Sequence, residues 1–391
     1  MTLRRWLLAL MFAAAPGYAQ TAPVSGFFVS TLGNDTIAIE RYTRSGDKIE
    51  GDILYRTGRV RVAHYVADLT SGRFKGMAVT TRRVGTDPAA PPVFSMSALV
   101  GDSAATVDVQ RNGRADTAAT GKRAFQGRVA LTVPGVPAAY GVYEQIIAFN
   151  PPPAADSIVI ATPGAGLSPR MSLSRRGRDT VIFNGGFIPE WIEVVTVGPN
   201  GRIIAVDATT TTVKTITRRV DRVDFDSIAR RWAAAEATAG APIPLSVPDT
   251  ARATIGAARV EVSYSRPARR GRTIFGGVVP WNQVWRTGAN AATQLTTSAD
   301  LIFGTTLLPA GKYTLWTLPT PSGAKLIINS QTGQWGTEYD EKRDLARLDL
   351  TQTRLAQPVE QFTIAMAPQG DGGILRMSWD NTEYSIPFRL K

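Results

Sequence analysis

The chain has 391 residues, a formal net charge of +12 and no cysteine. Its length exceeds what one hydrophobic core usually supports, and its 43% hydrophobic and 19% charged residues are typical of globular proteins, so we expect two folded domains. The lack of cysteine excludes disulfides, thiolate metal sites and cysteine nucleophiles.

Residues 1–19 are predicted to be a secretory signal peptide. Two arginines precede an apolar run that ends at Ala15, and the small-x-small cleavage site Gly17-Tyr18-Ala19 follows. The run is too short to span a bilayer, and no later stretch reaches the roughly 20 apolar residues that a transmembrane helix needs. We therefore expect an exported protein, periplasmic or secreted, without a transmembrane segment.

The positive charge is spread evenly along the chain. Without the signal peptide, 42 basic and 32 acidic residues remain, and residues 250–391 contain 16 basic and 11 acidic ones. An exported protein with such a distribution is not expected to bind nucleic acid. A weak attraction to anionic envelope polymers or lipid head groups is the better physical interpretation.

Residues 20–239 are predicted to form an antiparallel β domain, because apolar residues recur mainly at every second position and turn signals interrupt them about every eight to twelve residues. His64 is the only histidine, which excludes a multi-histidine metal site. It shares its predicted strand face with Val62 and Val66. We therefore expect His64 to be packed or semi-buried in the sheet and not to be catalytic.

Three segments of this domain differ from the simple strand pattern. Tyr140–Phe149 is compatible with a helix or a strand, and the four threonines Thr209–Thr212 favour an exposed strand. Asp224 or Asp226 caps a predicted helix that runs to about Ala237 and closes the domain.

A linker and a second β domain follow. Residues 240–249 contain three prolines and little charge, which predicts an extended, semi-rigid linker. In residues 250–391 at least seven short stretches again alternate with a period of two, and this pattern is typical of a β-sandwich or jelly roll.

The second domain contains four motifs rich in glycine, proline, tryptophan and arginine. They are R-P-x-x-x-G-R from Arg266 to Arg272, W-R-T-G-A-N from Trp285 to Asn290, L-P-A-G from Leu308 to Gly311, and Q-W-G from Gln334 to Gly336 with Tyr339-Asp340 after it. In their order and residue pattern, these motifs resemble those of the bacterial domain of unknown function 2911 family over about residues 250–391. The resemblance implies an exported bacterial protein with an all-β domain and brings no established activity. In that family an acidic residue often follows the asparagine, and Ala291 at this position weakens any role of the loop as a general base.

The W-R-T-G-A-N motif supplies the sharpest candidate site. Trp285, Arg286 and Asn290 place an aromatic ring, a guanidinium fork and an amide within six residues. Together with Trp335 and Tyr339, they are predicted to line a cleft that stacks on sugar rings or aromatic ligands and orients polar groups. In a second interpretation, which remains open, Trp285 is a core residue and Arg286 braces the loop through backbone carbonyls.

The arginines of the first motif extend this candidate site. Arg266 and Arg272 match the family motif and are predicted to hold a carboxylate, phosphate or sulfate through their guanidinium forks. Arg269 and Arg270 fall at its variable positions and are expected to be solvated loop residues.

Three functions remain open at this stage. The leading hypothesis is non-catalytic binding of an envelope glycan or another anionic small ligand by the second domain. The alternatives are a polymer hydrolase that uses carboxylates among Glu338, Asp340 and Glu341, and a lipid carrier whose first domain is a half-barrel-like sheet. No catalytic residue, metal site or cofactor is predicted, and the sequence does not define the oligomeric state.

Overall fold

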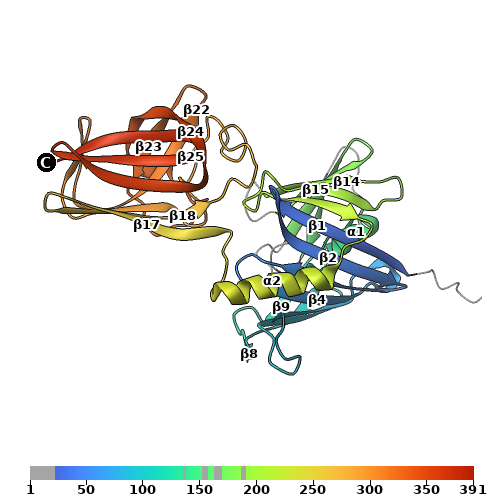
Figure 1. Cartoon of the computed structure of the whole chain (residues 1–391). Coiled ribbons are helices and arrows are strands. Elements are labelled where there is room, and N and C mark those ends of the chain that lie inside the picture. Colours follow the sequence, from blue (N-terminus) through green and yellow to red (C-terminus); the bar gives the residue numbers. More distant parts are fainter. Residues whose placement is uncertain (1–22, 135–137, 152–156, 163–169, 186–190) are drawn as a thin grey trace, which may run out of the picture.

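The computed structural model describes residues 23–134, 138–151, 157–162, 170–185 and 191–391; the predicted signal peptide lies outside the described residues. Within these ranges the chain forms two β-sheets, each around its own hydrophobic core, and two α-helices (Figure 1). The prediction of a mainly β protein built from two sheets is confirmed.

The first sheet has 16 strands, in the order β10-β11-β12-β13-β14-β15-β16-β1-β2-β3-β4-β5-β6-β7-β8, with β9 paired to β7. Its neighbouring strands are antiparallel except β10 and β11. The strands are β1 (Val24–Leu32), β2 (Asp35–Ser45), β3 (Lys48–Tyr55), β4 (Arg61–Asp68), β5 (Gly76–Arg83), β6 (Phe94–Val100), β7 (Ala104–Arg111), β8 (Arg114–Ala115), β9 (Gly121–Ala124), β10 (Arg128–Val129), β11 (Ser157–Ala161), β12 (Arg170–Arg176), β13 (Thr180–Asn184), β14 (Ile192–Val197), β15 (Ile203–Asp207) and β16 (Ile216–Val220). A short 3-10 helix, η1, spans Thr70–Gly72.

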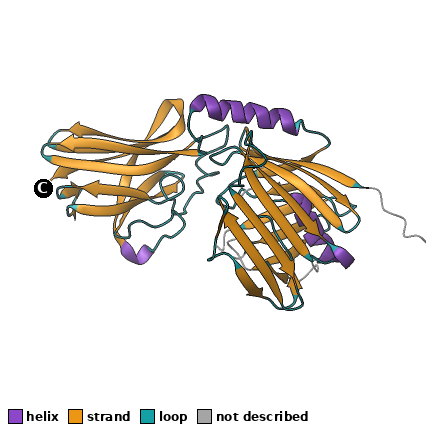
Figure 2. Ribbon diagram, turned by 90° about the horizontal axis from the view of Figure 1, so that it is seen from below, coloured by secondary structure: helices purple, strands orange, loops and turns teal. Residues whose placement is uncertain are grey.

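The first sheet curves around helix α1 (Tyr140–Phe149), which is buried in its main core (Figure 2). Glu40 of β2 holds the start of this helix. Its carboxylate accepts hydrogen bonds from the backbone N–H groups of Tyr140 (2.6 Å) and Gly141 (3.0 Å), and from the Tyr65 hydroxyl (2.6 Å). A carboxylate at this place satisfies helix N–H groups that have no partner within the helix and interacts favourably with its dipole. The segment that the sequence left open between helix and strand is therefore a helix.

Helix α2 (Phe225–Ala239) packs on the opposite face of the first sheet (Figure 2). The Asp224 side chain caps the helix by accepting a hydrogen bond from the Ser227 N–H. Asp224 is one of the two residues that are predicted as the cap. Trp232 is buried against the sheet, and the Arg56 guanidinium lies 4.7 Å from the centre of its ring. The helix thus covers apolar strand residues that would otherwise face water.

Of the two positions expected for His64, packed or semi-buried, the packed one is wrong. Its side chain is 52% exposed, and its Nδ1 lies 2.8 Å from Oδ1 of Asp52. The buried face of β4 is formed by the alternate residues Ala63, Tyr65 and Ala67. The valines beside His64 are only half-buried, so the apolar pattern of this strand did not identify its inner face.

Thr209–Thr212 form a turn between β15 and β16 and not the expected strand. The Asp207 carboxylate accepts hydrogen bonds from the backbone N–H (2.8 Å) and the hydroxyl (2.6 Å) of Thr209. The Thr211 hydroxyl donates to the Ala208 carbonyl (2.7 Å). Such local bonds from side chain to backbone compete with the strand ladder and end it here.

The second sheet has nine strands in the order β17-β18-β19-β22-β23-β24-β25-β20-β21. They are β17 (Ser246–Ile255), β18 (Ala258–Pro267), β19 (Thr293–Thr297), β20 (Leu301–Phe303), β21 (Thr306–Leu308), β22 (Gly311–Thr320), β23 (Gly323–Asn329), β24 (Asp344–Gln369) and β25 (Gly372–Leu390), and η2 (Glu341–Arg343) is a 3-10 helix. Strand β17 begins inside the stretch that the sequence predicts as linker, because Ser246 already pairs with Pro267.

The second sheet folds back on itself into two layers. Register shifts between Arg354 and Thr363 bend β24, and its later part lies beside β18. There the Ile364 N–H donates to the Tyr264 hydroxyl (2.9 Å). Figure 1 shows β24 and β25 above β17 and β18, with the core between the two layers.

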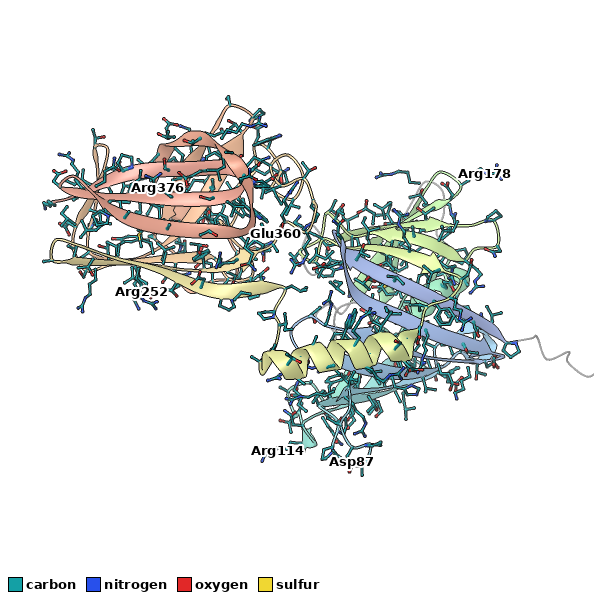
Figure 3. The ribbon with its side chains drawn as sticks, viewed as in Figure 1. Asp87, Arg114, Arg178, Arg252, Glu360 and Arg376 are labelled. Atoms are coloured by element: carbon teal, nitrogen blue, oxygen red, sulfur yellow. The ribbon has the colours of Figure 1, made fainter. Side chains whose placement is uncertain are left out.

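Charged side chains are distributed over the surface of both domains, as the positions of Arg114, Arg178, Arg252 and Arg376 illustrate (Figure 3). In the described ranges, neither helix has the length and apolar character that crossing a membrane requires.

We predict that buried Glu193 makes the first domain less stable as the pH rises. Burial raises the pKa of Glu193 to about 7, from 4.5, so the folded state keeps a proton that the unfolded state loses between these values. The free energy of unfolding, followed by urea denaturation at pH 5 and pH 8, should fall over this window, with Glu193 contributing about 3 kcal/mol at most. In the Glu193→Gln variant, the free energy of unfolding should decrease less between pH 5 and pH 8.

Glu50→Gln is the matched control, because the Glu50 side chain is 48% exposed. An equal pH dependence in Glu193→Gln and the parent protein would contradict the prediction. Glu40 contributes in the same direction, since burial also raises its pKa to about 7, so part of the slope should remain in the variant.

Candidate functional site

The two domains meet where the β1–β2 turn contacts the loop after β18. The Asn34 N–H donates to the Arg270 carbonyl (3.0 Å), and Nε of Arg270 donates to the Asp35 carboxylate (2.8 Å). Gly33 and Gly271 both have positive φ. A Cβ atom at Gly33 would collide with the Arg270 carbonyl oxygen, and one at Gly271 with the Asn34 amide. Two positions without side chains therefore allow this close contact.

A cleft with two lobes opens beside this contact. The first lobe has a volume of about 380 Å³ and the second a volume of about 950 Å³. The first domain contributes the turn of residues 209–214, and the second domain contributes the loops of residues 285–290 and 335–339. The sequence predicted a cleft within the second domain; this one lies between the two domains, because the domain contact brings the turn of the first against the loops of the second.

The W-R-T-G-A-N loop is fixed in a strained conformation. Trp285 and Thr317 of β22 exchange two backbone hydrogen bonds (2.8 and 2.9 Å), and the hydroxyls of Thr287 and Thr317 are 2.7 Å apart. The Asn290 carbonyl accepts from the Gly336 N–H (2.9 Å). Thr287 has φ 52° and Asn290 has φ 63°. A left-handed conformation is unusual for a β-branched residue and persists only where its surroundings enforce it.

Arg286 projects from this fixed loop into both lobes of the cleft. No hydrogen bond or ion pair connects its side chain to another residue within the described part of the chain. Burial lowers the pKa of its guanidinium. The alternative interpretation, in which Arg286 braces the loop through backbone carbonyls, has no such bond to support it among these residues.

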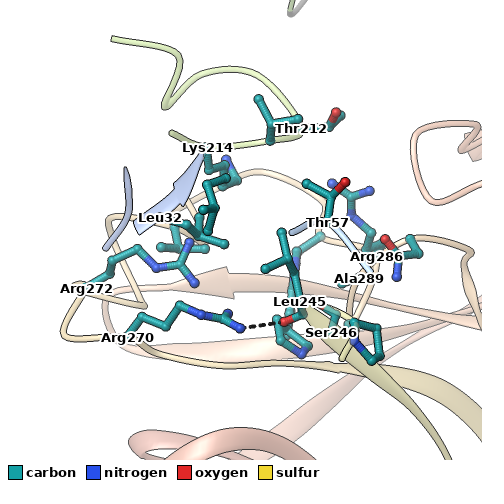
Figure 4. Close-up of a pocket in the computed structure, with 18 of the residues that line it drawn as sticks. Leu32, Thr57, Thr212, Lys214, Leu245, Ser246, Arg270, Arg272, Arg286 and Ala289 are labelled. Atoms are coloured by element: carbon teal, nitrogen blue, oxygen red, sulfur yellow. Dashed lines mark hydrogen bonds between the residues drawn. The ribbon is translucent and has the colours of Figure 1, made fainter. Parts of the chain in front are cut away.

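Lys214 and Arg272 also line the cleft, and in Figure 4 Lys214 lies between Arg272 on one side and Arg286 on the other. Lys214 has φ 54° and its Nζ donates to the Thr209 carbonyl (3.2 Å). Burial lowers the pKa of Lys214, and the nearby charges of Arg286 and Arg272 lower it further. Burial also lowers the pKa of Arg272 to about 10, with repulsion from Arg270 as the next cause. Lys214 thus lies among positive charges, whereas Glu360 and Asp35 partly offset the charge of Arg272.

No aspartate or glutamate is among the described residues that line either lobe. The carboxylates considered for a hydrolase have other partners: Glu338 accepts from the Trp335 N–H, Asp340 caps η2, and Glu341 pairs with Arg347 (2.7 Å). The described residues also contain no group of three or more side chains suited to hold a metal ion. The described part of the cleft lining therefore carries positive charge and no carboxylate.

The predicted aromatic residues occupy different environments. Trp285 lines the cleft with one part of its ring system and stacks on Trp379 (5.7 Å between ring centres) in the core. Trp335 is 50% exposed and lines the first lobe. Tyr339 lines the second lobe beside Trp316, and its hydroxyl donates to Asp344 (2.6 Å). Only Trp335 presents a large exposed ring.

The arginines of the first motif separate into two groups. Arg266 does not line the cleft: it donates to the Phe362 carbonyl (3.2 Å) and the Thr363 hydroxyl (2.9 Å), and so joins the two layers of the second sheet. Arg272 lines both lobes, although it donates to two carbonyls of its own loop. Arg270, expected to be solvated, lines the first lobe and holds the domain contact.

Sequence reasoning missed Lys214 and Arg270. Lys214 lies in the first domain, far in sequence from the motifs, and only the domain contact brings it to Arg286. Arg270 occupies a variable position of its motif. A binding role for Trp285, Arg286, Asn290, Arg272, Trp335 and Tyr339 stays a prediction.

The comparisons with known proteins give one family match, over part of the chain, and no function. Residues 246–388 match the family model described as "Protein of unknown function (DUF2911)", the family that the motifs suggested. No curated protein matches the chain. Among solved structures, isotype 1 transferrin binding protein B from serogroup B Neisseria meningitidis is similar with a TM-score of 0.14 and 9% identity, over 95% of this chain and 77% of that one. A TM-score this low supports no statement on fold or function.

We predict that Gly33→Ala separates the domains without unfolding either of them. The new Cβ collides with the Arg270 carbonyl oxygen, so the turn cannot keep its contact. Small-angle X-ray scattering should show a larger radius of gyration. Limited proteolysis should cut faster between residues 240 and 246.

Gly46→Ala provides the matched control, because Gly46 also has a positive φ (56°) in a hairpin turn, but no atom lies within 4 Å of the place that its new methyl group would take. Both variants carry the same local strain of about 1 kcal/mol. Equal scattering curves for the two variants would show that the contact at Gly33 does not hold the domains together.

Proposed function

We propose that this protein is an exported, non-catalytic binding protein that holds an anionic small ligand or an acidic envelope glycan in the cleft between its domains. The observation that carries the proposal is the charge of the cleft wall. Lys214, Arg272 and Arg286 line both lobes, and no described lining residue is acidic. An anion at this place would offset the repulsion between these cations and the free-energy cost of burying them.

The state of Arg286 supports the same proposal. A guanidinium offers five N–H donors in a planar fork suited to carboxylate and phosphate groups. In this protein the fork has no partner among the described residues, while the loop that carries it is fixed by hydrogen bonds to Thr317. A rigid loop loses little conformational freedom on binding, and this preorganisation favours affinity.

The proposal places the protein outside the cytoplasm, in the periplasm or the medium. Its support is the N-terminal sequence, with two arginines, a short apolar run and a small-x-small site that ends at Ala19. We expect the mature chain to begin at Gln20. Intact-mass measurement of the protein from its native cell envelope checks this, and a chain that retains Met1 would contradict it.

We predict that Arg286→Lys weakens the binding of inorganic pyrophosphate, titrated at low salt and followed by tryptophan fluorescence or calorimetry. Lysine keeps the charge and loses the fork, and a hydrogen bond to a charged group contributes on the order of 1.5 to 3 kcal/mol. The dissociation constant should therefore rise by at least about tenfold.

Arg354→Lys controls for the substitution itself, since Arg354 is exposed on β24 and lines neither lobe. It should bind like the parent protein. If Arg286→Lys lowers the melting temperature and leaves pyrophosphate binding unchanged, Arg286 has a structural role and the proposal loses its main residue.

A further inference from the structure

The two lobes of the cleft share a junction, and this junction contains the unpaired positive charge. The residues that line both lobes are Thr212, Lys214, Arg272, Val278, Trp285 and Arg286. All three cations of the proposed site are in this shared set. A ligand that reaches them from one lobe therefore has space beyond them in the other.

Outside the junction the walls carry almost no net charge. The described residues that line only the second lobe include no charged side chain. Those that line only the first lobe include Arg270, which forms an ion pair with Asp35 (2.8 Å). A ligand suited to this charge distribution has its negative charge in the middle and uncharged groups at both ends.

The two lobes differ in the groups that they offer. The first lobe presents apolar surface from Leu245 and the half-exposed Trp335. The second presents Gln283 and Thr337, both exposed and without a side-chain hydrogen bond in the described part of the chain. Free amide and hydroxyl groups beside aromatic rings are the groups that recognise sugars.

Resting on the proposed function, we infer that the ligand is a pyrophosphate diester, with its pyrophosphate at the junction, an uncharged sugar in the second lobe and an apolar or flat organic group in the first. Three neighbouring cations favour the two negative charges of a pyrophosphate diester over the single charge of a phosphate diester. A lipid-linked and a nucleotide-linked sugar share this chemistry.

The test compares five probes by calorimetry: inorganic pyrophosphate, N-acetylglucosamine, UDP-N-acetylglucosamine, N-acetylglucosamine linked through pyrophosphate to a short prenyl chain, and galacturonate as a carboxylate without phosphate. We expect at least one diester to bind at least about tenfold more tightly than inorganic pyrophosphate. The better of the two diesters identifies the group that the first lobe accepts.

Three variants assign the parts of the ligand to the parts of the cleft. Lys214→Asn, chosen because asparagine tolerates a positive φ, should weaken all pyrophosphate probes alike. Gln283→Ala should weaken only the probes that carry the sugar. Trp335→Ala should weaken only the diesters. If Lys214→Asn does not fold, Arg286→Lys replaces it.

The outcomes separate this inference from the proposed function. If inorganic pyrophosphate binds as tightly as both diesters, or if only carboxylates such as galacturonate bind, the inference is overturned while anion binding stands. If none of these probes binds, the proposed function fails together with the inference. Tighter diester binding that Gln283→Ala and Trp335→Ala leave unchanged would also overturn it.

Discussion

The contact between the Gly33–Asp35 turn and the loop around Arg270 is the interaction on which the rest of the molecule depends. Each domain has its own core, so each can hold its own fold. The cleft has no such independence, since its two walls come from different domains. One ion pair, one backbone hydrogen bond and two glycines at close range set the distance between those walls.

The interior of the first domain follows from a different constraint. A strongly curved sheet must fill its concave face, and here α1 does so with apolar side chains. Glu40 fixes the helix on the concave face of the sheet by accepting hydrogen bonds from the two backbone N–H groups at the start of the helix. The lipid-carrier alternative requires a large apolar hollow in this sheet, and in the described residues the helix takes that space.

The sequence was informative where structure depends on neighbouring residues. The cap at Asp224, the alternation in the strands and the shaped loop at Trp285 are all local features, and each has a counterpart in the structure. It was misleading at His64 and Thr209–Thr212. There the outcome depended on which face of a sheet was covered, and on side chains that competed with the strand ladder.

In the candidate site, too, the sequence identified a residue within a local motif and missed one that only the tertiary structure brings close. Arg286 could be selected from its motif, because it follows a tryptophan and precedes Thr287-Gly288 in a loop where plain turn residues would suffice. Lys214 could not, since nothing near it in the sequence distinguishes it from other lysines. Its position beside Arg286 exists only after both domains have folded and docked, and no local pattern encodes that event.

Because the cleft is built from both domains, the region that matches the family model and the proposed binding site cover different parts of this chain. The region matched by the family model, residues 246–388, includes Arg272 and Arg286 but not Lys214. A relative that combined this module with another N-terminal partner would inherit two of the three junction cations. Its preferred ligand would then depend on what the new partner placed opposite the loop, so ligand preference in such proteins would follow domain combination more closely than sequence similarity within the module.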